Sequence, residues 1–230
     1  MAKRKVSSAA EEVEVQIEDV KAPVANFWEH NHNLIMYGLG AIAVAVGLWF
    51  AYTNFYVAPK QKEAVGAMWQ AQAKFEQDSF KLALENPGGG YDGFVTLADK
   101  FSGTAAGNTA NYYAGISYLQ LGDFDNAIKY LEDFSPEGDL LPITKYGALG
   151  DCYAEKKDMA KAVDFYNKAV KAGDNEVLTA YYLKKLGMAN EYNQNIEAAK
   201  EAYMRIKKDF PLSQEARDIE KYIYRAGGTN

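Results

Sequence analysis

The chain has 230 residues, of which 48% are hydrophobic and 24% charged, so it can form one or two globular domains and is not disordered throughout. Its net charge of −6 argues against nucleic acid as a partner, because phosphate groups bind to basic surfaces. The chain has only two histidines, His30 and His32, and one cysteine, Cys152. These are too few to form a Ser-His-Asp or Cys-His catalytic site or most transition-metal sites. We therefore expect that the protein is not an enzyme and that it has no catalytic residue, metal or cofactor.

The first feature along the chain is an apolar run that follows a polar N-terminal tail, residues 1–33, which we expect to be partly disordered. From Leu34 to Val57 there is no charged side chain, and a helix needs about 20 residues to cross a bilayer. An export signal, a buried core helix and a nucleotide loop are the alternatives. The apolar part of an export signal is shorter and lies nearer the N-terminus. The Gly38-x-Gly40 pair continues into Ala-Ile-Ala-Val without a turn, unlike a phosphate loop. We predict a transmembrane helix over residues 34–57.

Aromatic residues at both ends of this run support a membrane span, since their rings settle at headgroup depth. They are Trp28 before the run and Trp49, Tyr52 and Tyr56 near its end.

Small residues form a ridge along the same segment. Ala43, Gly47 and Ala51 fall at i, i+4 and i+8, which allows another transmembrane helix to approach closely. This ridge is a candidate docking face, although Ala and Gly are also simply common in membrane helices.

The flanking charges do not fix the orientation of the span. The tail holds four basic and six acidic residues, whereas Lys60, Lys62 and Lys74 follow the span, so positive-inside counting is equivocal.

Three segments behind the span share one pattern. Each contains a glycine followed 12 residues later by an alanine, and the glycines lie 35 and 37 residues apart. Such small residues let the two helices of a hairpin touch. The pattern resembles the tetratricopeptide repeat, which reads Gly-x-x-Tyr and then Ala-x-x-x-aromatic at a period near 34. The three pairs are Gly115 and Ala127, Gly150 and Ala162, and Gly187 and Ala199.

A weaker fourth unit precedes these repeats. Its first helix would begin after Pro59 with one apolar face, its second would carry Phe94 and Phe101, and the stretch from Leu84 to Gly90 would be a loop. The residues expected on the apolar face are Val65, Met68, Trp69 and Phe75.

The predicted fold is therefore all-α, with a single N-terminal transmembrane helix followed by a helical solenoid of the tetratricopeptide type (an α-α superhelix). The solenoid covers residues 58–226, with about four helix pairs and a C-terminal capping helix that starts near Ser213. Residues 227–230 form a short tail.

Solenoids of this kind present a concave groove lined by the first helix of each pair. With the register set by the three glycines, this groove would bind extended or unfolded polypeptide, or a protein partner. The alternative is that its residues are merely exposed positions on the helices. The candidate residues are Tyr112, Ile116, Leu119, Thr144, Asp151, Tyr181, Lys184, Met188 and Glu191.

The layout as a whole resembles the YfgM family of ancillary subunits of the bacterial Sec translocon. The resemblance rests on the acidic tail, the stretch Phe27–Asn33 (FWEHNHN), one membrane helix and the repeats. It implies a single-pass protein of the bacterial inner membrane, with a cytoplasmic N-terminus and a periplasmic repeat domain. The implied partners are the SecYEG translocon, a membrane-anchored chaperone of the PpiD (parvulin) type, translocating polypeptides and the lipid bilayer.

Two other hypotheses remain open from the residues themselves. The chain could be a scaffold subunit of another secretion or assembly complex of the cell envelope, or an adaptor anchored the other way round, with its repeats in the cytoplasm. Labelling of Cys152 from one side of the membrane is a candidate test of the orientation.

Overall fold

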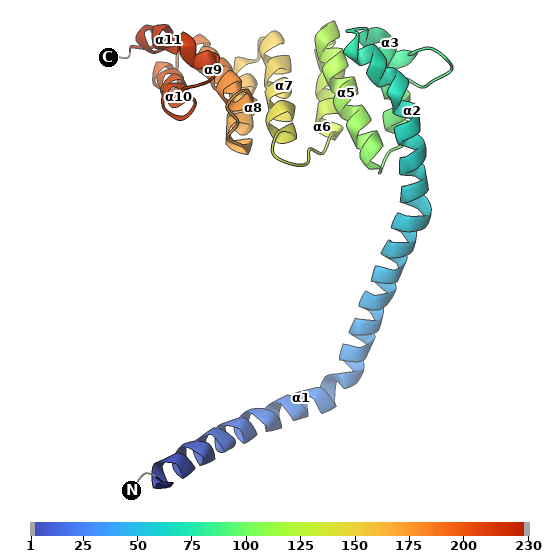
Figure 1. Ribbon diagram of the computed structural model, residues 1–230, viewed down its shortest axis with the longest axis vertical. Helices are drawn as coiled ribbons and strands as arrows, with labels where there is room; N and C mark the ends of the chain where they lie inside the picture. The colour runs from blue at the N-terminus through green and yellow to red at the C-terminus, as the bar shows by residue number, and fades with distance from the viewer. Residues whose placement is uncertain (1–2, 228–230) are drawn as a thin grey trace. The chain divides into compact units, whose positions relative to one another are not determined.

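The computed structural model describes the backbone of residues 3–227 and the side chains of residues 27–227. Within these residues the chain is helical and contains no strand, which confirms the all-α prediction. It divides into two compact units, Met1–Ala58 and Pro59–Asn230, and Figure 1 shows the helices of each. Residues 228–230 of the predicted C-terminal tail lie outside the described residues.

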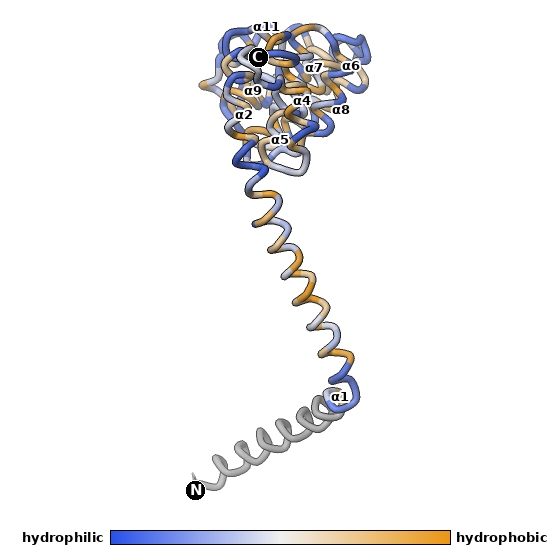
Figure 2. The backbone as a smooth tube through the Cα atoms, turned by 90° about the vertical axis from the view of Figure 1, so that its right-hand side faces the viewer, coloured by the Kyte–Doolittle hydropathy of each residue, from blue (hydrophilic) through white to orange (hydrophobic). Residues whose placement is uncertain are grey.

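The first unit consists of one long helix, α1 (Lys3–Tyr52), followed by a π-helical turn, Thr53–Val57. None of residues 27–57 is buried, and Figure 2 shows hydrophobic residues all along the middle of this segment. The apolar run is therefore not a core helix of this chain, and Gly38 and Gly40 lie inside a helix rather than in a nucleotide loop. The segment is long and apolar enough to cross a membrane.

Helical backbone begins at Lys3, whereas the sequence predicts partial disorder in residues 1–33. This part of the chain contains no glycine and a single proline, Pro23, and is rich in Ala, Glu and Val. Its composition is compatible with a helix, because glycine and proline are the residues that most strongly oppose helix formation.

Two polar side chains at the end of the apolar run bond to their own helix. The hydroxyl of Thr53 and the amide of Asn54 both donate to the carbonyl of Phe50, at 3.0 and 2.9 Å. Such internal bonds let polar residues occupy an apolar segment without leaving a donor unsatisfied.

The second unit is a stack of helices that follow one another in chain order (Figure 1). Its first helices are α2, α3 and α4, which precede three hairpins, α5–α6, α7–α8 and α9–α10, and a short last helix, α11. Their bounds are α2 Ala58–Glu76, α3 Phe80–Glu85, α4 Phe94–Lys100, α5 Ala105–Leu121, α6 Phe124–Asp133, α7 Leu141–Glu155, α8 Met159–Ala172, α9 Leu178–Tyr192, α10 Ile196–Asp209 and α11 Ile219–Arg225, with a 3₁₀ turn at Glu215–Arg217 before α11.

The three hairpins turn in the same way. In each, an Asp or Asn side chain precedes the second helix and accepts a hydrogen bond from a backbone N–H of its first turn, which satisfies a donor that the helix itself leaves unpaired. These caps are Asp123, Asp158 and Asn195, which accept from Asn126, Lys161 and Ala198.

The glycine of each repeat faces a buried side chain of the second helix. A Cβ atom at Gly150 would lie 2.5 Å from the ring of Tyr166, and one at Gly187 would lie 2.2 Å from the ring of Tyr203. In the first hairpin, Leu131 occupies the equivalent position against Gly115. The close approach of paired helices expected from the small residues is therefore present.

The apolar face predicted for α2 is partly wrong. Met68 is buried, but Val65 and Trp69 are 59% and 53% exposed. The buried stripe also contains Ala64 and Ala71, which face the core cluster that α2 forms with α3, α4 and α5. Alanines at these positions let α2 pack closely. Of the predicted residues, Phe75 also packs against this cluster, and only Val65 and Trp69 point outward.

The stack has an inner layer, α5, α7 and α9, and an outer layer, α6, α8 and α10. The backbones of α5 and α7, and of α7 and α9, approach each other directly. In the described part of the chain, the backbones of α6 and α8 do not approach each other directly, and neither do those of α8 and α10. The stack therefore curves with the inner layer on its concave side.

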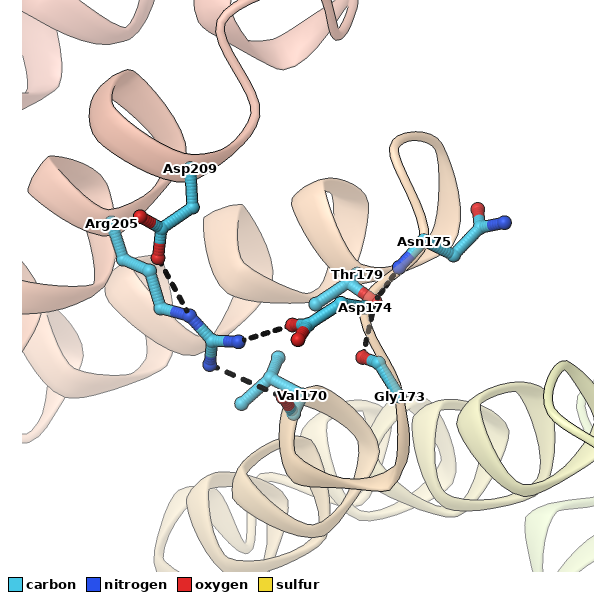
Figure 3. A network of polar contacts seen from close by, with 7 residues as sticks. All are labelled: Val170, Gly173, Asp174, Asn175, Thr179, Arg205 and Asp209. Carbon is cyan, nitrogen blue, oxygen red and sulfur yellow. Dashed lines mark hydrogen bonds and ion pairs between the residues drawn. The ribbon is translucent and has the colours of Figure 1, made fainter.

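A polar network joins the last two hairpins, as Figure 3 shows. Arg205 of α10 donates to the carbonyl of Val170 at the end of α8, at 3.2 Å, and to the carboxylate of Asp174, at 2.7 Å. The hydroxyl of Thr179 donates to the carbonyl of Gly173, at 2.8 Å. The loop between the hairpins is thereby fixed from both sides, which holds the inner face of α9 in register with that of α7.

Cys152 lies in a small core cluster between the first and second hairpins and is fully buried. Burial, and to a lesser extent the charge of Asp151, raises the pKa of its thiol to about 12. Because labelling requires an exposed thiolate that attacks the reagent, labelling of Cys152 reports on its burial and does not test the orientation in a membrane.

Candidate functional site

The concave face carries a pocket of about 440 Å³ between α5, α7 and α9. Three of the residues that the sequence predicts for the groove line it: Leu119, Asp151 and Tyr181. Each comes from a different helix of the inner layer, so the register of the three glycines places them side by side.

The carboxylate of Asp151 is the centre of the polar side of this pocket. One of its oxygens, Oδ1, accepts from the hydroxyl of Tyr166 and from the amine of Lys185, both at 2.7 Å. Burial and the charge of Asp151 raise the pKa of Tyr166, so its hydroxyl remains a donor. Burial alone lowers the pKa of Lys185, but the charge of Asp151 and hydrogen bonds to Asp151 and Tyr181 together raise it. The pocket therefore contains an ion pair between α7 and α9.

Three other predicted residues lie at the N-terminal end of the concave face. Tyr112 lies near Thr144, and burial raises the pKa of its phenol. Its ring packs against Phe134, with 5.2 Å between ring centres. Ile116 packs beside Tyr112 on the core cluster between hairpins, so this end of the face is largely closed by its own side chains.

The C-terminal end of the face is tied to α11. Lys184 pairs with Asp218 at 2.9 Å, and Glu191 accepts two hydrogen bonds from the guanidinium of Arg225. Both predicted groove residues thus hold the last helix in place. Met188, between them, is 48% exposed.

Sequence reasoning missed several residues of the pocket. Lys185 could have been found, because it follows Tyr181 by one helical turn on the same face of α9. Tyr166 and Phe124 come from the outer layer, and their repeat positions indicate only core packing. Glu155 extends the line of Asp151 by one turn of α7.

The ridge predicted in the apolar segment lies on α1. Ala43, Gly47 and Ala51 are exposed, and a Cβ atom at Gly47 would meet nothing within 4 Å. Docking of another helix on this ridge stays a prediction.

Comparison with protein families shows which kind of repeat the three hairpins form. Residues 109–135, 146–172 and 183–213 match families described as Tetratricopeptide repeat. The chain contains tetratricopeptide repeats. The three matches fall on the three hairpins, with Gly115, Gly150 and Gly187 in their first helices. A comparison with curated proteins gave no match to the chain. Domains built from tetratricopeptide repeats generally act as scaffolds for protein–protein interaction.

Proposed function

We propose that the protein is a membrane-anchored adaptor whose tetratricopeptide domain binds protein partners on its concave face. The observation that carries this proposal is the combination of the repeats with an open pocket on the inner layer, where three adjacent inner helices each contribute a side chain. Solenoids commonly use such concave surfaces for binding.

The anchor is α1. Its apolar segment is exposed on all sides and carries large hydrophobic side chains, including Ile42, Val46 and Phe50. Exposure of so much apolar surface to water is unfavourable, whereas in a bilayer the same surface is favourable. A membrane location therefore explains why this helix has no partner within the described part of the chain.

We further propose that the partners belong to protein export. The resemblance of the layout and of the stretch Phe27–Asn33 to the YfgM family supports an inner-membrane location with the N-terminus in the cytoplasm and the repeats in the periplasm. In that setting the domain would act next to SecYEG with a parvulin-type chaperone and contact translocating polypeptides.

Affinity purification of the detergent-solubilised full chain tests this proposal. We expect enrichment of translocon subunits and of a parvulin-type chaperone. A matched pair of variants locates the contact: Met188→Ala on the inner layer should lower partner recovery, whereas Met204→Ala, equally exposed on the outer layer, should not.

Other outcomes discriminate between the hypotheses. Recovery of subunits of a different envelope complex would favour the scaffold alternative. Recovery of cytoplasmic proteins together with protease protection of the domain in intact cells with a permeabilised outer membrane would favour the opposite orientation. Absence of any translocon subunit would contradict the export role.

A further inference from the structure

We infer that the pocket between α5, α7 and α9 binds a lysine or arginine side chain of an extended polypeptide. The inference rests on the proposed function, that the concave face binds protein partners, and it names the chemistry of the segment that the face prefers.

One wall of the pocket is apolar. Leu119 at the end of α5 and Phe124 at the start of α6 line it, and both are only partly buried. Lysine and arginine have long aliphatic stems that lie along apolar surfaces while the charged group stays at a polar end. This wall therefore matches the stem of a basic side chain.

The other wall has unused acceptors. Lys185 and Tyr166 both bond to Oδ1 of Asp151, and the second oxygen, Oδ2, accepts no hydrogen bond from the described residues. Glu155 is exposed and forms no ion pair or hydrogen bond within residues 27–227. A carboxylate can accept several hydrogen bonds, so both groups have free positions for a donor.

The balance of charge favours a cation over an anion. Two carboxylates, Asp151 and Glu155, and one amine, Lys185, line the pocket, and the amine is already paired. An incoming carboxylate would meet like charge on Asp151 and Glu155. An incoming ammonium or guanidinium would meet complementary charge, which favours association and selects among partners.

Two large apolar side chains follow the pocket residue Lys185 along α9. Met188 lies one turn beyond Lys185 and is followed by Tyr192, and these side chains are 48% and 66% exposed. The pocket volume of about 440 Å³ is within the range of about 300–1,000 Å³ of ligand pockets. The segment that fits best therefore has a basic residue flanked by apolar ones.

Fluorescence anisotropy with three labelled peptides tests the inference on the full chain in detergent. The peptides share apolar flanks and differ only at one central position, which is Lys, Gln or Glu. We expect the Lys peptide to bind about three- to tenfold more tightly than the Gln peptide, and the Glu peptide to bind most weakly. Added salt should reduce the preference, because the contact is at the surface.

The matched variants are Glu155→Gln and Glu201→Gln. Glu155 makes no contact that the fold needs, so its substitution should leave thermal unfolding unchanged and remove most of the preference for Lys. Glu201 is exposed on α10 in the outer layer, and its substitution should change nothing. Equal binding of the three peptides, tighter binding of the Glu peptide, or no binding of any of them would overturn the inference. The proposed function is tested by a different experiment: it would be contradicted if the affinity purification recovered no specific partner.

Discussion

Substitution of Gly187 by alanine is expected to destabilise the repeat domain by about 1–3 kcal/mol, because the new Cβ would lie 2.2 Å from the ring of Tyr203. That ring is fully buried. The gain in helix propensity, about 1 kcal/mol, is too small to offset the clash. Thermal unfolding followed by circular dichroism should show a decrease in Tm of about 3–10 °C.

Gly66→Ala is the matched control. Gly66 also lies inside a helix, α2, but it is exposed, and a Cβ atom there would meet nothing within 4 Å. The same chemical change should therefore stabilise the domain by about 0.5–1 kcal/mol, through helix propensity alone. If Gly187→Ala were as stabilising as Gly66→Ala, the close contact between α9 and α10 would not exist.

Two arginines in the middle of the apolar segment are expected to abolish membrane integration. Val44 and Val46 are 63% and 58% exposed, so their replacement disturbs no packing within the chain. Each arginine near the bilayer centre costs about 2.5–3.5 kcal/mol on insertion scales. The double variant Val44→Arg, Val46→Arg should leave the carbonate-resistant membrane fraction in which we expect the wild-type chain.

Leu34→Arg controls for the added charge itself. Leu34 is at the start of the uncharged run, where an arginine side chain can extend to the interface. This variant should remain in the membrane fraction. Retention of the double variant would show that α1 does not cross the bilayer.

The repeats could be predicted because close helix packing restricts residue types. Only a very small residue fits where a ring from the partner helix lies against the backbone, so Gly150 and Gly187 mark the hairpins directly in the sequence. The face of α2 was harder to predict. Hydrophobicity favoured Trp69, but the contact is made by Ala64 and Ala71, whose small size hides their role.

The sequence predicted which residues lie on the concave face but not which side chains bond to one another there. Repeat register identifies Asp151 as an inner-layer residue, but its bond to the hydroxyl of Tyr166 depends on how far a core side chain reaches across the hairpin. Pairing of Lys184 with Asp218 depends on where α11 docks. No periodic pattern in the sequence contains that information, because α11 is not a repeat.

The central claim is that the concave face contacts protein partners, and site-specific photo-crosslinking tests it most directly. A photoreactive residue replaces Met188 on the inner layer or, in a second strain, Met204 on the outer layer, which are 48% and 51% exposed. After irradiation of intact cells, adducts are identified by mass spectrometry. We predict discrete protein adducts from position 188 and none from position 204. Adducts from position 204 alone, or from neither position, would contradict the account.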